Sequence, residues 1–153
     1  MGDIKAKSSV PILGNGDITT PEIAVKRMRD YGVDAVFIGR GALRNPFIFE
    51  QSVALWKGES YQKPSAERYL ALIVDLRAAL QEIFPSKVAM IHARKFLAWY
   101  ATGFPGCHEF RSRVFSLPDP EVFWAESEAF FERSSKDRDM QHLAQPFLMG
   151  GHG

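Results

Sequence analysis

The sequence predicts a chain in two parts, an α/β part followed by an all-α helical bundle. In the first part, short apolar runs end in glycine-containing loops and flank a stretch with helical periodicity, which is the pattern of a βαβ unit. From Ser65 onward, apolar residues recur only at helical spacing. A polar stretch, residues 59–64, separates the two patterns, so we expect a domain boundary after residue 60.

The βαβ unit is predicted from two apolar runs, residues 10–13 and residues 35–38. Between them, Thr20 is a suitable N-cap, Pro21 suits the first helical position, and Gly32 suits the end of the helix. The second run has no polar alternation, which is typical of strands buried on both faces of a parallel sheet. We therefore expect two parallel strands joined by a right-handed crossover.

A glycine loop follows each predicted strand, at residues 14–17 and 39–41. Both loops lie at the carboxyl ends of neighbouring parallel strands, where α/β folds bind ligands. Glycines allow backbone N–H groups to approach an anion, and Arg40 adds a full charge with a fork of donors. The pair matches the phosphate site after strands seven and eight of a TIM, or (β/α)₈, barrel. Neither loop has a Walker or GxGxxG pattern, which excludes those two kinds of nucleotide site. The alternative interpretation is that the glycines serve only as turn residues.

The remaining pattern is helical throughout. Asn45-Pro46 is expected to open a helix that ends at Gly58, with an apolar face made of Phe47, Ile48, Phe49, Val53, Leu55 and Trp56. Four helices are expected after the boundary, over about residues 65–84, 87–102, 108–115 and 119–133. Their inward residues are expected to include Tyr69, Leu72, Ile73, Leu76, Leu80 and Ile83 in the first helix, and Val122, Phe123, Ala125, Phe130 and Phe131 in the last. Residues 136–153 are expected to form a flexible tail.

Charge is distributed unevenly along the second part. Between residues 87 and 113, a single acid, Glu109, accompanies the basic residues Lys87, Arg94, Lys95, Arg111 and Arg113. The last helix is acidic, so the basic residues form a local patch that suits contact with a nucleic-acid backbone. The alternative is an ordinary solvated helix face.

Composition excludes several classes of protein. The 153 residues carry a net charge of +1, so the chain as a whole has no general attraction for nucleic acid. A single cysteine rules out a disulfide framework and fits a reducing, cytoplasmic compartment. The four histidines lack metal-ligand spacing, so no metal site is expected. No apolar run reaches the length of about 18 residues that a membrane span needs, and no secretory signal is visible.

The motifs together resemble the tRNA-dihydrouridine synthase family. The resemblance rests on long segments at fixed spacing: Pro11-Ile12-Leu13-Gly14-Asn15-Gly16-Asp17-Ile18, Thr20-Pro21-Glu22, Ile38-Gly39-Arg40-Gly41-Ala42-Leu43 and Asn45-Pro46. It implies an FMN-bearing TIM barrel followed by a helical tRNA-binding domain. It also implies the NADPH-driven reduction of uridine to 5,6-dihydrouridine in tRNA.

The resemblance also assigns roles to residues. It implies that the FMN phosphate is held by Asn15, Gly16, Asp17, Gly39 and Arg40. Ala93-Arg94-Lys95, Trp99-Tyr100, Gly103 and Pro105-Gly106 are similar to the helical domain of the family. The tRNA-binding residues implied are Arg94, Lys95, Arg111 and Arg113. Phe96 departs from the family pattern, because relatives often have histidine at this position.

A complete barrel needs about 200 residues or more, so this chain is too short to hold one together with a helical domain. We therefore expect residues 1–60 to be the last two βα units of the barrel, and residues 61–135 to be the helical domain. The family's general acid is a cysteine on an earlier strand, which Cys107 cannot replace. No catalytic residue is predicted, the chain alone is expected to be inactive, and its open sheet edges are expected to promote self-association.

Two alternative functions stay open at this stage. The helical part could act by itself as a non-enzymatic RNA-binding module. Alternatively, the first part could belong to another phosphate-binding TIM-barrel enzyme.

Overall fold

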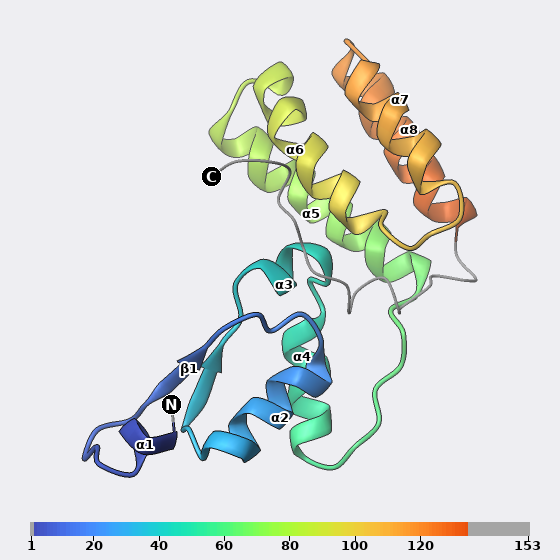
Figure 1. Ribbon diagram of the computed structural model, residues 1–153. Helices are drawn as coiled ribbons and strands as arrows, with labels where there is room; N and C mark the ends of the chain where they lie inside the picture. The colour runs from blue at the N-terminus through green and yellow to red at the C-terminus, as the bar shows by residue number, and fades with distance from the viewer. Residues whose placement is uncertain (1, 135–153) are drawn as a thin grey trace. The chain divides into compact units, whose positions relative to one another are not determined.

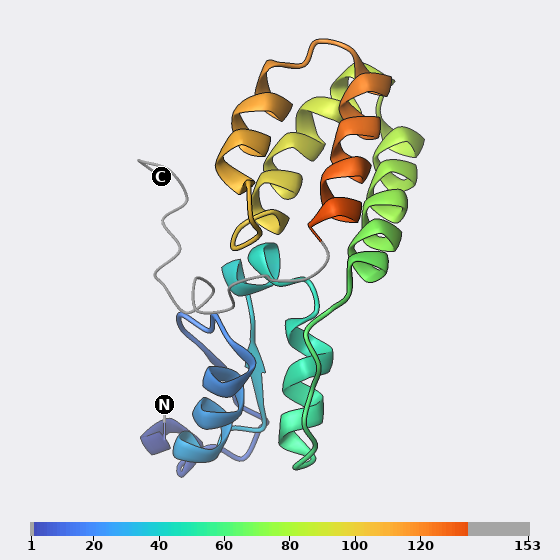
Figure 2. The same ribbon diagram turned by 90° about the vertical axis from the view of Figure 1, so that its right-hand side faces the viewer.

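The computed structural model describes residues 2–134, with the exception of the side chain of Ala66. These residues form two compact units that divide between Gln62 and Lys63, and each unit is described by itself (Figures 1 and 2). The predicted tail, residues 136–153, lies outside the described residues.

The first unit contains the predicted βαβ arrangement (Figure 1). Its elements are α1 (Gly2–Lys5), β1 (Leu13–Asn15), α2 (Pro21–Tyr31), β2 (Ala35–Phe37), α3 (Arg40–Arg44) and α4 (Ile48–Trp56). The two strands are parallel, with Leu13 paired to Ala35 and Asn15 paired to Phe37. The predicted caps of α2 are confirmed. The Thr20 side chain accepts a hydrogen bond from the Ile23 N–H, and Gly32 ends the helix in the left-handed region at φ +60°.

Asp34 fixes the start of both strands. Its carboxylate accepts hydrogen bonds from the Ile12 N–H at 2.7 Å and from the Lys5 ammonium at 2.6 Å. The hydrogen bond from Lys5 and that from Ile12 together lower the pKa of Asp34. These contacts join α1, the segment before β1 and the segment before β2.

Helices cover one face of the small sheet. Figures 1 and 2 show α2 and α4 on the same side of the strands, where α2 packs against β2 and α4 packs against α2. The core on this side contains Ile18, Ala24, Ile38 and Ile48, with Val36 packed against it.

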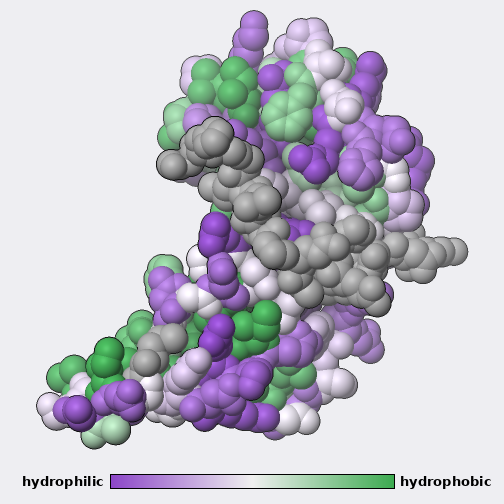
Figure 3. Space-filling view, viewed as in Figure 1, coloured by the Kyte–Doolittle hydropathy of each residue, from purple (hydrophilic) through white to green (hydrophobic). Residues whose placement is uncertain are grey.

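The other face of the sheet is exposed, so the prediction of strands buried on both faces is wrong for the described residues. Leu13 is 61% exposed and Phe37 is 60% exposed. Both side chains lie on one face, because Leu13, Asn15, Ala35 and Phe37 alternate with Gly14 and Val36. Figure 3 shows apolar residues on the surface of the first unit beside β1.

The segment after β2 forms two helices. The short helix α3 follows the second glycine loop, which was expected to lie just ahead of a helix, and α4 begins at Ile48, two residues after Pro46. The predicted apolar face is also wrong in part, because Phe49, Val53 and Trp56 are about half exposed. Helix α4 buries Ile48, as predicted, and also Gln51, which was not predicted.

The second unit is a helical bundle, as predicted. Its four helices are α5 (Ala66–Ile83), α6 (Ser86–Tyr100), α7 (Cys107–Ser116) and α8 (Pro120–Arg133). Aromatic rings fill much of the core. The ring of Tyr69 stacks on that of Phe131 with 5.6 Å between centroids, and the ring of Phe110 stacks on that of Phe130 at 4.0 Å.

The inward faces of α5 and α8 differ from the prediction at three positions. Ile83 is 70% exposed, and Val122 and Ala125 are also exposed. In α8 the buried positions are Phe123, Trp124, Ser127, Phe130 and Phe131, which recur every three or four residues. Val122 and Ala125 fall between these positions and therefore lie on the outer side of the helix.

Tyr61 ties the segment after α4 to α2. Its hydroxyl donates a hydrogen bond of 2.7 Å to Oε1 of Glu22. Burial acts to raise the pKa of Glu22, but hydrogen bonds from Tyr61, from its own backbone and from Thr20 outweigh it, and the net pKa is lowered. Burial and the nearby Glu22 together raise the pKa of Tyr61 to about 12.

This pair gives a test of the fold in alkaline solution. The pKa of Tyr61 in the folded chain lies above the ordinary value of 10.0. The contribution of Tyr61 to the free energy of unfolding should therefore be fully present below pH 10 and should be lost as the pH rises toward 12. In Glu22→Gln, we expect the Tyr61 pKa to drop toward 10, because the neighbouring negative charge is removed. Absorbance at the tyrosinate wavelength measures this titration, and Tyr61→Phe identifies the contribution of Tyr61. An unchanged titration in Glu22→Gln would contradict the pairing.

Candidate anion-binding site and basic helical surface

The five residues predicted to hold a phosphate lie together in one pocket of the first unit. Asn15, Gly16 and Asp17 follow β1, and Gly39 and Arg40 lie at the start of α3. The pocket has a volume of about 710 Å³, and its lining is completed by Ile18, Thr19, Arg27 and Gly41. The parallel pairing of Asn15 with Phe37 accounts for this arrangement, since it sends both loops out at the same edge of the sheet.

The backbone of the first loop is open to a ligand. Gly16 has φ +141° and Asp17 has φ +39°, so two successive residues adopt positive φ. Such a conformation suits glycine, and Asp tolerates it better than most residues do. The space where a Cβ would stand at Gly16 or Gly39 is empty within 4 Å. A ligand can therefore approach the main chain of both loops.

Gly41 permits the close approach of the two loops. A Cβ atom at this position would overlap the carbonyl oxygen of Ile18 and would also crowd Thr19. Only glycine fits between α3 and the end of the first loop without movement of the backbone. The width of the pocket thus depends on a residue without a side chain.

An ion pair crosses the pocket. Nη2 of Arg40 lies 2.8 Å from Oδ1 of Asp17, and both side chains are mostly exposed, at 56% and 79%. An exposed pair of this kind contributes at most about 1 kcal/mol, so a dianionic ligand can compete with Asp17 for the guanidinium. Asp17 also holds Arg40 over the loops in the absence of such a ligand.

Arg27 is a second cation of the pocket that the sequence analysis missed. It extends from α2 and is half-buried, and its Nη1 donates a hydrogen bond of 2.9 Å to the Tyr31 hydroxyl. Its guanidinium carbon also lies 5.6 Å from the centre of the Tyr31 ring. No motif indicates this residue. The only signal was the position of a basic residue on the helix that follows the first loop.

Buried polar side chains fix the turn between α3 and α4. Nδ2 of Asn45 donates a hydrogen bond of 2.7 Å to Oε1 of Gln51, and both residues are almost completely buried. Arg44 is buried beside them in the sequence, and burial lowers its pKa. The Asn45–Gln51 hydrogen bond therefore fixes the chain directly after α3, the helix that begins with Arg40.

The four residues predicted to bind tRNA differ in whether their side chains already form hydrogen bonds or ion pairs with other described residues. Arg94 donates a hydrogen bond from Nη2 to the Leu117 carbonyl oxygen, and its Nε is buried without a partner among the described residues. Arg113 is held by Glu126, with 2.8 Å between Nε and Oε2, and this contact raises the pKa of Arg113 and lowers that of Glu126. Lys95 and Arg111 are exposed, and neither forms a hydrogen bond or ion pair within residues 2–134.

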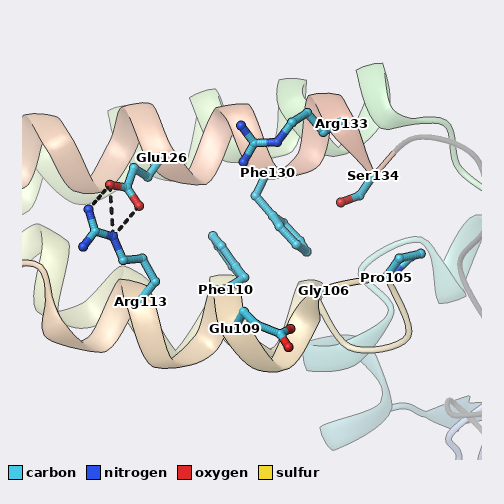
Figure 4. Close-up of a pocket in the computed structure, with 9 residues that line it drawn as sticks. All are labelled: Pro105, Gly106, Glu109, Phe110, Arg113, Glu126, Phe130, Arg133 and Ser134. Carbon is cyan, nitrogen blue, oxygen red and sulfur yellow. Dashed lines mark hydrogen bonds and ion pairs between the residues drawn. The ribbon is translucent and has the colours of Figure 1, made fainter.

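A second pocket lies between α7 and α8 (Figure 4). Phe110 and Phe130 point into the space between the helices, and the Arg113–Glu126 ion pair lies toward one end. The pocket has a volume of about 730 Å³, and its lining is completed by Pro105, Gly106, Glu109, Arg133 and Ser134. Two acids and two arginines line it, so it has no net charge to attract an anion.

The described part of the chain, residues 2–134, contains neither a membrane-spanning helix nor a cluster of metal ligands. None of its helices has both the length and the apolar character that crossing a membrane requires. It also contains no group of three or more His, Cys, Asp or Glu side chains arranged to hold a metal ion.

Comparison with known proteins gives a consistent result. Residues 1–135 match the family described as Dihydrouridine synthase (Dus). Relatives include tRNA-dihydrouridine synthase B of Pseudomonas putida, which is 36% identical over 148 residues, or 94% of this chain and 44% of the relative. Another is tRNA-dihydrouridine synthase B of Xanthomonas campestris, which is 35% identical over 86% of this chain and 40% of its own length. A probable tRNA-dihydrouridine synthase of Rickettsia conorii is 31% identical over 76% of this chain and 36% of its own length. The chain thus spans less than half the length of these relatives.

The contact at Gly41 gives a test of how the pocket is built. Gly41→Ala should destabilise the first unit, at the upper end of the range of about 1–3 kcal/mol for overpacking, because the new methyl group meets rigid backbone. Gly2→Ala is the matched control, since its Cβ would make an ordinary contact of 3.8 Å with the Tyr31 carbonyl oxygen. Chemical denaturation measures both variants. Equal midpoints would show that α3 can move away from Ile18 at little cost.

Proposed function

Because the chain belongs to the dihydrouridine synthase family, we propose that it is the C-terminal part of an FMN-dependent oxidoreductase that acts on tRNA. The reaction proposed for the complete enzyme is the NADPH-driven reduction of uridine to 5,6-dihydrouridine. Such an enzyme works where tRNA is found, and a single cysteine suits a reducing compartment, so we place it in the cytoplasm.

The two-loop pocket supports FMN as the cofactor. Residues from two loops that are more than 20 positions apart line one pocket, and this observation carries the proposal. Open glycine backbone, a positive-φ loop and arginine donors fit a phosphate monoester. Asn15, Gly16 and Gly39 offer backbone N–H groups, Arg40 offers charge, and Asp17 orients Arg40. Bound FMN would supply the hydride for the uracil ring.

The exposed face of the sheet supports the proposal that β1 and β2 belong to a barrel with further strands. In a TIM barrel, side chains on one face of each strand fill the interior, and Leu13 and Phe37 are exposed on such a face. We therefore propose that residues 1–60 are the last two βα units, and that residues 61–135 are the helical domain. With this face open, the isolated chain should self-associate, which sedimentation at several concentrations can measure.

The second unit is the proposed tRNA-binding part. Lys95 and Arg111 are exposed and form no hydrogen bond or ion pair within residues 2–134, so they are available for tRNA phosphates. Arg113 can reach a phosphate by exchanging Glu126 for it, because the pair is exposed at the surface. Arg94 can contribute through its charge while it holds the end of α7 by its contact with Leu117.

No described residue is assigned a catalytic role. Cys107 begins α7 in the second unit, while the candidate cofactor site belongs to the first. We propose that the chain alone does not reduce uridine, and dihydrouridine formed by the purified chain with FMN and NADPH would refute this.

The cofactor assignment is tested by titrating FMN into the purified chain. We expect saturable quenching of flavin fluorescence in the original chain and an affinity about tenfold weaker in Arg40→Ala, because a charge-assisted hydrogen bond to the phosphate is lost. Lys26→Ala is the control, since Lys26 is exposed and pairs with Asp30 outside the pocket. If Arg40→Ala binds FMN as tightly as the original chain does, Arg40 does not bind the phosphate.

The RNA assignment is tested by the double variant Lys95→Ala/Arg111→Ala. Removing two phosphate contacts should weaken tRNA binding and reduce the slope of log K against log salt by about 1.5. Lys26→Ala/Lys57→Ala removes the same charge from the first unit and should leave the slope unchanged. Filter binding at several salt concentrations measures both. A slope that falls equally in the two double variants would indicate a general charge effect and no defined patch.

A further inference from the structure

We infer that Arg27 is a second phosphate-binding residue of the two-loop pocket, and this inference rests on the proposed function of that pocket. Arg27 belongs to neither glycine loop, and it reaches the pocket from the second turn of α2. It also lines, together with Tyr31, a small crevice formed by Gly14, Asn15 and Gly16. Arg27 therefore lines the pocket beside the loop whose backbone is open to an anion.

The charges of the pocket favour a direct contribution of Arg27 to anion binding. The charged side chains in the lining are Asp17, Arg27 and Arg40. Arg40 is paired with Asp17, so these two cancel in the free chain. Arg27 has no carboxylate partner within residues 2–134, and its hydrogen bond goes to the hydroxyl of Tyr31. Without Arg27, a phosphate dianion would enter a pocket of zero net charge and face the Asp17 carboxylate.

The geometry of Arg27 prepares it for this role. Tyr31 lies one helical turn later, accepts a hydrogen bond from Nη1 and places its ring against the guanidinium. These contacts use one edge of the guanidinium and leave the other donors for a ligand. A side chain that is already held in place loses less conformational entropy on binding than a free arginine does. Arg27 is thus a fixed charge, while Arg40 must exchange Asp17 for the ligand.

Two ligands with the same phosphate monoester test this inference. FMN and ribose 5-phosphate are each titrated into the full chain, and the backbone amide shifts of Gly16, Gly39 and Gly41 report binding. We expect Arg27→Gln to weaken both ligands by the same factor, about tenfold, because Arg27 is assigned to the phosphate that they share. The neighbouring variant Lys26→Gln removes an exposed charge from the same helix and should bind both ligands normally.

A second variant separates charge from helix packing. Arg27→Lys keeps the charge but lacks the fork, so it should recover part of the affinity lost in Arg27→Gln. The amide spectrum of each variant also shows directly whether α2 is intact. If no recovery occurs in a folded Arg27→Lys, a charge role for Arg27 is wrong.

The remaining outcomes distinguish this inference from the proposed function. Unchanged affinity for both ligands in Arg27→Gln would overturn the inference and leave the pocket assignment intact. A loss for FMN alone would place Arg27 at the flavin and also overturn it. If ribose 5-phosphate binds in an Arg27-dependent way and FMN does not bind, the inference stands and the FMN assignment fails. If neither ligand shifts the amides of the original chain, both fail.

Discussion

The candidate site depends on how closely two segments of backbone approach each other. Gly41 lets α3 lie directly against Ile18 and Thr19, and this contact sets the distance between the loops that follow β1 and β2. The parallel pairing of Leu13 with Ala35 brings the loops to one edge of the sheet, but it does not determine the separation between them. The buried Asn45–Gln51 hydrogen bond then fixes the chain that leaves α3. The pocket is a property of main-chain packing before any charged side chain contributes.

The charged groups of the pocket have distinct physical roles. Asp17 and Arg40 form a pair that is exposed and can exchange partners, while Arg27 is half-buried and held by Tyr31. Both arginines are thus held in place before a ligand binds, and the ligand need only displace a weak, exposed salt bridge. A ligand must compete with the Asp17 carboxylate for Arg40, and a dianion competes better than a monoanion, so the pocket should discriminate by ligand charge as well as by shape.

Local features of the fold could be predicted from the sequence, and features that depend on neighbouring elements could not. Thr20 and Gly32 were sufficient to place α2, because capping acts within a few residues. The faces of α4 and α8 were partly wrong at Phe49 and Val122, since periodicity shows that a face exists without showing which residues other helices cover. In the site, the loop residues could be predicted from their motifs. Arg27 could not, because a helix side chain that reaches a pocket depends on tertiary packing.

The open face of the sheet also affects how the two units respond to heat and denaturant. Leu13 and Phe37 are already in contact with water in the folded first unit, so unfolding exposes less new apolar surface than in a domain with two covered faces. The heat capacity change of that unit should therefore lie below the usual value of about 12–15 cal/mol/K per residue, with a correspondingly small denaturant slope. The aromatic core of the second unit is enclosed and should show the steeper dependence. The chain is thus expected to unfold in two transitions of different cooperativity, and a single melting temperature would not describe it.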